Sequence, residues 1–527
     1  MGRVVTGLAA RCLLGVAAGL VLFDDAFAIG EGGKVPARPL VMLVGALLGA
    51  SLLHMMACLV CYRRPPALGL VIVVAAAARM FALFGGPGPG LEGDHEQLRL
   101  DAALVNAGVA PHEFTPSQIA NPDPVLEETY SAERQERLKR ARVALARTGA
   151  PDPSKVQHPH LRSTVTPPVH RLNSFAGLLK PETSRGFGFF ALVADSIAIF
   201  MLIMALRCLG LPLSWVMVYA WSPVLLREVY GTMHADVWIL PALAALAWGL
   251  AAGRKTIMVA GLAVAVAVRP VMLLLDLALV RRLGPVGMVL VVVLSAALMA
   301  PFVDTDVRPT SYVQGDVYVW RNYEYNSLAE GLMRGALKDV PARAKQSIHL
   351  AGVEIQREGE SPTVLWAKLG CIVLLLGLIL FVVLRDKEAL FEKHHREHAL
   401  DDLFMVMVGL LIVTPVLTPW HVLWLLPVLA LRPGPSWLML PGLVCLSHLT
   451  HLTGPQSADL TFMGGKLSFR IFEFGAFALF WVVDRMWRRT LLSEVRSDVV
   501  EEGAARSYAP QIEYEPAEER EPVGAAY

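Results

Sequence analysis

Long apolar runs alternate with polar loops through most of the 527 residues. Several runs exceed the roughly 20 residues that a helix needs to span the hydrocarbon core of a bilayer. With 55% hydrophobic residues and a mean hydropathy of +0.50, the chain is neither a soluble enzyme nor a nucleic-acid binder. We expect helical segments near residues 4–23, 37–61, 66–86, 187–206, 212–227, 234–252, 256–280, 285–303, 364–384, 403–418, 421–431, 436–452 and 467–487.

Basic loops between these runs set the predicted sidedness, because Lys and Arg favour the cytoplasmic side. The pattern is consistent only if residues 256–280 enter and return, and Arg269-Pro270 breaks that run in the middle. About twelve crossings then remain, with both termini inside. The first run is interpreted as an uncleaved helix; Ala26-Phe27-Ala28 leaves a cleaved signal peptide as the alternative.

The predicted fold class is therefore an all-α polytopic membrane protein with short broken or re-entrant helices. Residues 131–147 read as an amphipathic helix that lies either on lipid headgroups or against protein only. The predicted regions are three transmembrane helices (1–86), a long outer loop with interfacial helices (87–186), a central transmembrane core (187–303), a second outer loop (304–363), C-terminal transmembrane helices (364–488) and a disordered cytoplasmic tail (489–527).

Asp94 is the first carboxylate outside the third predicted crossing. A carboxylate in that position can accept a proton from an incoming hydroxyl group. The alternative is an ordinary acidic residue at the membrane interface.

The stretch from Trp221 to Asp236 lies between two apolar runs and contains Arg227, Glu228, His234 and Asp236. Ionisable groups at a membrane segment are costly and need partners, so they are functional candidates. For Asp236, a favourable charge at a helix N-terminus is the alternative; for His234, a packed histidine.

Arg269 lies in the middle of an apolar stretch, where a central arginine costs about 2.5–3.5 kcal/mol on insertion scales. Its planar fork and fixed charge suit a phosphate group. The alternative is a buried ion pair with a carboxylate such as Asp276.

Two prolines in residues 414–424 are expected to break a helix beside His421. Trp420 and Trp424 offer aromatic surface for a sugar or a lipid. An aromatic belt at the membrane interface explains either tryptophan equally well.

At these residues the chain resembles the polyprenol-phosphate-dependent glycosyltransferases of the GT-C fold, in particular bacterial mannosyltransferase-like membrane proteins. Residues 94–112 follow the family's opening D-x-x-R-Y-x-W-D-G-R-x-x-x-x-G-x-N-P-Y at Asp94, Asp101, Gly108 and Pro111. Residues 221–236 follow its W-N-P-L-V-L-K-E-x-x-G-x-G-H-x-D at Trp221, Pro223, Leu226, Glu228, Gly231, His234 and Asp236, with Arg227 in place of Lys.

Further motifs occur in the family's order across roughly residues 70–430. The family's Y-P-P-L-A-Q is similar to residues 166–171, and its basic residue before proline resembles Arg269-Pro270. Its W-x-F-N resembles Tyr323 to Asn326, and its N-P-W-Y-x-L-W-x-L-P resembles Thr418 to Pro427. Gln97 and Leu98 or Leu100 replace the Arg and the aromatic residue after the first Asp, and His112 replaces the Tyr.

The resemblance implies a membrane enzyme that moves a hexose, with mannose the first expectation, from a polyprenyl-phosphate donor to a lipid-linked or glycan acceptor with inversion. It implies Asp94 as the base and an outer-face site at a bacterial plasma membrane. Substrate binding is expected at Asp101, Arg227, Glu228, His234, Asp236, Arg269, Asn326, Trp420 and His421.

The expected partners are the sugar donor, the acceptor and the bilayer, without nucleic acid and without a cofactor. A metal held by Asp94, His95, Glu96 and His234 is an open alternative. Two other functions stay open: a glycolipid transporter or flippase, which would also place ionisable groups in a cavity, and a non-catalytic subunit that keeps the fold.

Overall fold

A computed structural model covers the chain. The structure describes Gly7 and residues 37–85, 94–148, 151–153, 156, 159–179, 185–304, 307, 310–312, 319–320, 326–337, 346–350, 353–357, 362–385, 395–432, 434–452, 473–482 and 484. Apart from Gly7, the first predicted helix and its alternative as a signal peptide lie outside these residues, as does the predicted C-terminal tail.

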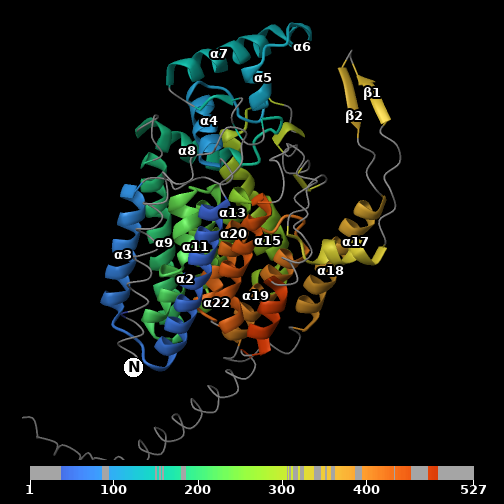
Figure 1. The fold of residues 1–527 in the computed structure, drawn as a ribbon. Coiled ribbons are helices and arrows are strands. Elements are labelled where there is room, and N and C mark those ends of the chain that lie inside the picture. The colour runs from blue at the N-terminus through green and yellow to red at the C-terminus, as the bar shows by residue number, and fades with distance from the viewer. Residues whose placement is uncertain are drawn as a thin grey trace, which may run out of the picture.

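A bundle of apolar helices forms the larger part of the described chain (Figure 1). By length and composition, five helices within the described residues are able to cross a membrane: Leu40–Tyr62, Gly186–Leu209, Ala235–Ala252, Val280–Phe302 and Val364–Arg385. Shorter apolar helices are Leu68–Phe84, Lys255–Val268, Pro419–Leu429, Pro435–Leu449 and Glu473–Val482. The bundle agrees with the predicted helical membrane protein, while the number of crossings stays a prediction.

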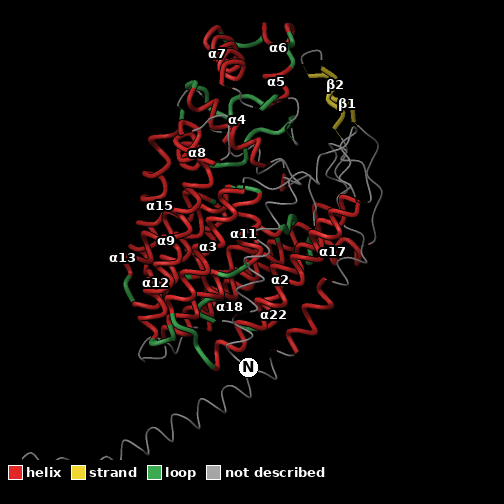
Figure 2. Tube along the Cα trace, turned by 60° about the vertical axis from the view of Figure 1, so that its left-hand side comes forward, coloured by secondary structure: helices red, strands yellow, loops and turns green. Residues whose placement is uncertain are grey.

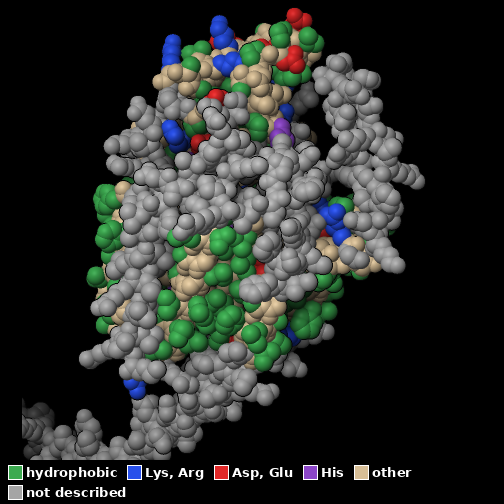
Figure 3. Space-filling model, viewed as in Figure 1, with side chains coloured by type: hydrophobic (Ala, Val, Ile, Leu, Met, Phe, Trp, Pro, Cys, Tyr) green, Lys and Arg blue, Asp and Glu red, His purple; other side chains and the backbone are tan. Residues whose placement is uncertain are grey.

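The longer elements of the bundle leave large apolar side chains on its outside. Val286 is 72% exposed and Val373 is 67% exposed, and Figure 3 shows hydrophobic side chains gathered on this part of the molecule. Such surface is typical of contact with lipid or with other protein. These elements are α2 (Ala37–Arg63), α3 (Leu68–Gly85), α9 (Arg185–Leu209), α12 (Ile239–Ala252), α13 (Lys255–Val268), α15 (Val280–Met299), α18 (Pro362–Arg385), α19 (His395–Val413) and α22 (Pro435–Val444).

Helix α12 lies in the middle of the bundle and packs on both α9 and α13. Two glycines allow the close approach to α13. A Cβ on Gly261 would lie 2.7 Å from the backbone nitrogen of Leu246, and one on Gly249 would lie 2.6 Å from that of Met258. Small residues at helix contacts are the usual means of tight packing in membrane bundles.

Interruptions divide the described bundle into shorter pieces. Breaks at Arg269-Pro270 and between Val413 and Pro419 agree with the proline-based prediction. The pieces are η3 (Leu213–Val216), α10 (Met217–Ala220), α11 (Pro223–Leu226), the π-helix η4 (Arg227–Gly231) and η5 (Ala235–Trp238); then η6 (Pro270–Met272), α14 (Leu273–Ala278) and η7 (Ala300–Phe302); then α20 (Pro419–Val422), η8 (Leu423–Leu425), α21 (Leu426–Leu429) and η9 (Cys445–Leu452).

The described residues between 94 and 179 form a second layer at one end of the bundle, which we call the cap (Figures 1 and 2). It contains α4 (Asp94–Asn106), α5 (Pro116–Ala120), α6 (Pro124–Glu128), α7 (Ala132–Thr148) and α8 (Pro167–Leu179). The cap has its own small core, in which Leu138 and Ala141 of α7 are buried with Leu100, Leu104 and Ile119.

The apolar face of α7 is therefore covered by protein, and α7 lies at the end of the cap away from the bundle (Figure 1). This favours the protein-contact interpretation of residues 131–147 over the lipid-headgroup one. The driving force is ordinary burial of apolar area, about 25 cal/mol per Å².

Residues 304–363, predicted as the second outer loop, contain α17 (Ala329–Leu337) and an antiparallel hairpin of β1 (Gln346–Leu350) and β2 (Val353–Arg357), in which Gln346 pairs with Arg357. Alternating polar and apolar residues on both sides of a Gly are a hairpin signal in the sequence. The hairpin is an addition to the predicted all-α class; the other described elements are helical.

Candidate functional site

Arg269 lies where α13 ends. Its backbone is extended, with φ −139° and ψ 101°, and Pro270 follows directly. Proline has no N–H for the helical hydrogen bond and disfavours a helical residue before it. The helix therefore ends inside an apolar run, and the Arg269 side chain is only 18% exposed.

Asp236 binds the Arg269 guanidinium through a two-point contact. Nε donates to Oδ1 at 2.7 Å and Nη2 donates to Oδ2 at 3.1 Å. The carboxylate is fully buried, and such a fork gives the strongest compensation for burying both charges. The partner of Arg269 is thus Asp236 rather than Asp276, the carboxylate named from the sequence.

His234 completes the cluster from the residue before η5. Its Nδ1 lies 2.9 Å from Oδ2 of Asp236 and 3.4 Å from the backbone nitrogen of Asp236. The two contacts need opposite protonation of Nδ1, and we assign the proton to Nδ1 because the carboxylate is the closer and stronger partner. Asp236 therefore orients both the imidazole and the guanidinium.

Trp420 covers one face of the His234 ring. The two rings are stacked, with centroids 4.2 Å apart and an angle of 21° between planes. Nδ1 of His421 and Oγ1 of Thr418 share a hydrogen bond at 2.7 Å. The His421 ring also meets the Trp424 ring edge to face, with centroids 4.9 Å apart. The second proline-marked break thus supplies an aromatic wall, made of Trp420, His421 and Trp424, beside the Arg269–Asp236 pair.

Arg227 and Glu228 belong to the π-helix η4 and lie in the protein interior, at 2% and 1% exposure. Arg227 Nη1 is 3.8 Å from Oε1 of Glu228. Among the described residues, neither Nη1 nor Nη2 of Arg227 has a hydrogen-bond partner. A buried guanidinium without such bonds is costly, and π-helices are frequent at functional sites.

The backbone just before His234 is strained. Met233 has φ +56°, a left-handed conformation that is uncommon for residues with a Cβ. Strain of this kind costs about 1–3 kcal/mol and is found most often at functional sites. Here it allows the chain to turn from η4 into η5 and to place His234 and Asp236 side by side.

Helix α8 of the cap contacts the bundle on both sides of this pair. Thr166, just before α8, donates from Oγ1 to the carbonyl of Val268 at 3.2 Å, next to Arg269. Trp238, at the end of η5, donates from Nε1 to Oδ1 of Asn173 at 3.1 Å. The Arg269–Asp236 pair therefore lies at the junction of bundle and cap.

Asp101 is buried between α4 and α8. It accepts hydrogen bonds from Gln97 Nε2 at 2.7 Å and Ser163 Oγ at 2.8 Å, and His170 Nδ1 lies 3.6 Å away. Burial raises the pKa of Asp101 to about 7 against the two hydrogen bonds. Burial also holds the pKa of His170 well below its usual value and lowers that of His112 to about 4.

Two other predicted residues lie elsewhere. Asp94 is the first residue of α4, and its side chain is outside the described residues. Asn326 is at φ +53° and donates from Nδ2 to both carboxylate oxygens of the buried Glu473, at 3.1 and 3.0 Å. Its described side-chain partner is thus Glu473, and none of the described contacts joins it to Arg269.

Sequence reasoning missed a second buried ion pair in the bundle. Arg79 Nε donates to Oδ2 of Asp195 at 2.5 Å, and its Nη1 donates to the carbonyl of Ala220 at 2.8 Å. Tyr230 of η4 donates its hydroxyl to the same Oδ2 at 2.8 Å. The signal was present, since Arg79 and Asp195 are lone charges inside apolar runs.

The geometry brings together five of the predicted residues: His234, Asp236, Arg269, Trp420 and His421. Such a cluster has the parts to bind an anion beside a flat apolar face of a sugar. Among the described residues, no group of three His, Cys, Asp or Glu side chains is placed to hold a metal ion.

Comparisons of the chain with protein-family models, with curated proteins and with solved structures gave no match.

Proposed function

We propose that the chain is a membrane glycosyltransferase that moves a hexose from a polyprenyl-phosphate donor to a carbohydrate or lipid-linked acceptor. The observation that carries the proposal is the Arg269–Asp236–His234 cluster, placed at a helix break and walled by stacked Trp420. The sequence motifs of the GT-C family support the same function, with mannose as the first sugar to test.

Two guanidinium groups support a phosphate-bearing donor. Arg269 is held by Asp236 through Nε and Nη2, and Arg227 is buried without a hydrogen bond from Nη1 or Nη2 among the described residues. Arginine is the side chain best suited to phosphate oxygens. In the proposal these groups stabilise the negative charge that develops on the leaving phosphate.

The aromatic wall supports a sugar next to that phosphate. Sugar rings present apolar C–H faces, and Trp420, stacked on His234, is a flat surface of the right kind. His234 and Asp236 offer polar atoms at its edge. The donor lipid would reach this point sideways from the bilayer, since the cluster lies among the apolar helices.

The reaction in this proposal is a single displacement. The acceptor hydroxyl oxygen attacks the anomeric carbon, the bond from that carbon to the phosphate oxygen breaks, and the polyprenyl phosphate leaves with the electron pair. The hydroxyl proton passes to the carboxylate of Asp94 as general base. Phosphate needs no protonating acid to leave, so one carboxylate suffices and the configuration inverts.

The cap lies on the outer face of a bacterial plasma membrane in this proposal. The basic loops of the sequence are the support, because they place the opposite ends of the helices in the cytoplasm. No cofactor is needed beyond the lipid-linked donor.

Transfer from radiolabelled polyprenyl-phosphate mannose in isolated membranes tests the proposal. Wild-type membranes should label a product, and Asp94→Asn should lower turnover by about 10²–10⁴-fold, the range for a lost general base. Asp123→Asn is the matched control, because Asp123 is an exposed cap at the start of α6 and Asn caps a helix as well as Asp. Near-normal turnover in Asp94→Asn would contradict the role of Asp94 as general base. Labelled donor crossing the bilayer without a product would favour the transporter instead.

A further inference from the structure

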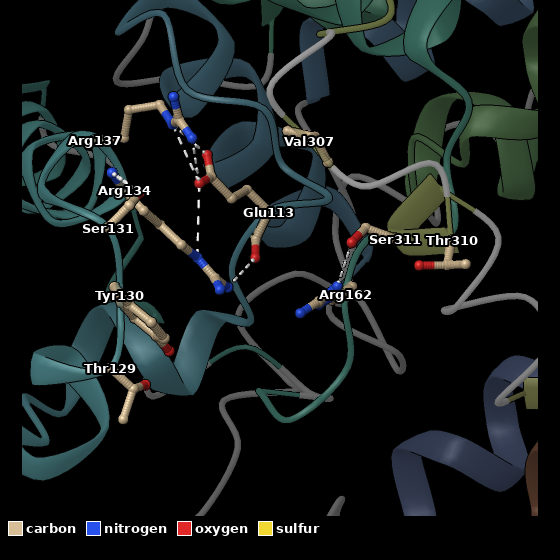
Figure 4. Close-up of a pocket in the computed structure, with 10 residues that line it drawn as sticks. All are labelled: Glu113, Thr129, Tyr130, Ser131, Arg134, Arg137, Arg162, Val307, Thr310 and Ser311. Carbon is tan, nitrogen blue, oxygen red and sulfur yellow. Dashed lines mark hydrogen bonds and ion pairs between the residues drawn. The ribbon is translucent and has the colours of Figure 1, made fainter.

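A second pocket lies in the cap, away from the Arg269 cluster. Its volume is about 460 Å³, enough for one or two sugar rings. Figure 4 shows its described lining, which combines arginines, hydroxyl groups and one aromatic ring. The lining residues are Glu113, Thr129, Tyr130, Ser131, Arg134, Arg137, Arg162, Val307, Thr310 and Ser311.

The charge of this pocket is positive. Three guanidinium groups face one carboxylate, Glu113, in the described lining. Arg137 binds that carboxylate at two points, with its Nε 2.9 Å from Oε2 and its Nη2 3.0 Å from Oε1. Glu113 is thus shared between Arg137 and Arg134, whose Nε lies 3.7 Å from Oε1, and by formal charge the described lining has two more arginines than carboxylates.

Arg134 is held in place by a ring contact and by a hydrogen bond from its Nη2 to the carbonyl of Glu113 at 3.4 Å. Its guanidinium lies over the ring of Tyr130, 4.0 Å from the centroid. Its Nε is 3.7 Å from Oε1 of Glu113 and has no hydrogen-bond partner among the described residues. Stacking on an aromatic ring orders a guanidinium while leaving its edge available to an anion.

Arg162 reaches the pocket from the opposite side (Figure 4). Its Nη1 donates to Oγ of Ser311 at 2.6 Å. The guanidinium groups of Arg134 and Arg162 face one another across the open space, with hydroxyl groups around them. Two guanidinium groups suit one oxyanion, and the hydroxyls suit the hydroxyls of a sugar.

The segment 162–166 connects this pocket to the Arg269 cluster. Arg162 lines the pocket, Ser163 donates to Asp101, and Thr166 donates to the carbonyl of Val268 beside Arg269. Four residue steps span at most roughly 14 Å between the Arg162 and Thr166 backbones. A saccharide of a few units is long enough to reach from one site to the other.

We infer that this arginine pocket binds an anionic saccharide, a sugar that carries a carboxylate or a phosphate. As part of the acceptor, such a sugar would hold the attacking hydroxyl near Arg269 and Asp94; this assignment to the acceptor rests on the proposed function. Binding itself does not require transfer.

Equilibrium binding to the purified full-length chain in lipid nanodiscs tests the pocket directly. The probes are glucuronic acid, glucose 6-phosphate, inorganic phosphate and, as the uncharged control, glucose. Both acidic sugars should bind, glucose should bind at least tenfold more weakly, and added salt should weaken the acidic sugars. Inorganic phosphate binding as tightly as glucose 6-phosphate would overturn the saccharide part of the inference. Equal binding of glucose and glucuronic acid would overturn all of it.

The double variant Arg134→Gln, Arg162→Gln should weaken binding of both acidic sugars at least tenfold at an unchanged melting temperature. Arg140→Gln is the matched control, since Arg140 is on the same helix and exposed outside the pocket. Equal weakening by the control would show binding to the basic surface of α7 in general and would contradict the inference.

A transfer assay with acidic and neutral acceptors separates the two proposals. The double variant should raise KM for the acidic acceptor and leave kcat within about twofold. If wild type transfers without preferring an acidic acceptor, the acceptor assignment fails and the proposed function stands. If wild type transfers nothing but still binds acidic sugars specifically, the proposed function fails and the pocket stands.

Discussion

Two buried Arg–Asp pairs in the described part of the bundle have the same chemistry and different surroundings. In the first, Arg79 and Asp195 are 2% and 0% exposed, and carbonyl groups and the Tyr230 hydroxyl surround the contact. In the second, Arg269 is 18% exposed, lies at a helix break and has Trp420 and His234 beside it. The comparison suggests that enclosure, rather than the pair itself, distinguishes a structural pair from a site.

The enclosed pair ties together three elements. Arg79 is on α3, Asp195 on α9, and Ala220 and Tyr230 belong to the broken segment before α12. Through Tyr230 the pair also supports the π-helix that carries Arg227 and Glu228. Its function is therefore to fix the segment from which the second pair is built.

Removing one partner of the enclosed pair has the largest expected effect. Arg79→Gln leaves the Asp195 charge without compensation, which costs about 3–5 kcal/mol for a buried pair. The thermal midpoint in detergent and the yield of folded protein should both fall sharply. Arg207→Gln, at the exposed end of α9, should leave both unchanged. A melting temperature of Arg79→Gln equal to that of the control would remove the structural role.

A substitution in the second pair should lower transfer activity strongly and stability only a little. Arg269→Gln is expected to lower transfer by about 10²–10³-fold, the range for one lost donor to a developing anion. The melting temperature should fall less than in Arg79→Gln, because Asp236 keeps His234 at 2.9 Å and Gln is itself a donor. Arg269→Lys keeps the charge without the fork and should recover only part of the rate. If Arg269→Gln melted at as low a temperature as Arg79→Gln, the two pairs would have the same structural role, and the distinction between them would be wrong.

Local signals predicted the parts of this site but not their pairing. Proline next to Arg269 predicted the break, and the charges of His234 and Asp236 stood out against the apolar runs. The partner of Arg269 is 33 residues away along the chain, and tertiary packing chose Asp236 over the sequence neighbour Asp276. Helix propensity holds no information on that choice.

Other features lie beyond what local signals report. The π-helix η4 and the left-handed Met233 are backbone adjustments to packing. The arginine pocket joins segments near residues 113, 130, 162 and 310, which no spacing rule connects. Arg79 and Asp195 were predictable as costly charges, and their omission shows that every lone charge in an apolar run needs a partner assigned.

Asp101, in the cap, allows a test by pH. Its pKa is raised by burial to about 7, so the folded protein holds a proton that the unfolded chain releases near pH 4. Its contribution to stability is complete at low pH and is lost as the pH rises to about 7. Asp101→Asn removes this loss. The unfolding free energy of the variant minus that of wild type should therefore rise by about 2–4 kcal/mol from pH 4 to pH 8.

The difference between wild type and Asp101→Asn is the quantity to measure, by thermal midpoints in detergent at several pH values. His112 and His170 have lowered pKa values and push stability the other way, upward with pH, in both proteins. The contribution of His112 cancels in the difference, whereas that of His170 is coupled to Asp101 at 3.6 Å, so the difference reports the Asp101–His170 pair. A difference that stays constant from pH 4 to 8 would contradict the raised pKa of Asp101.

The stacked ring has the smallest expected effect and tests the open side of the second pair. Trp420→Leu removes the contact with His234, and aromatic pairs are worth about 0.5–1.5 kcal/mol. If the ring contacts the sugar in ground state and transition state alike, KM should rise about two- to twelvefold with kcat unchanged. Trp420→Phe should recover part of this. Trp366→Leu, at 64% exposure on α18, is the matched control. A fall in kcat at constant KM would mean instead that Trp420 acts through His234 and Asp236, by holding the Arg269 fork in register during the reaction.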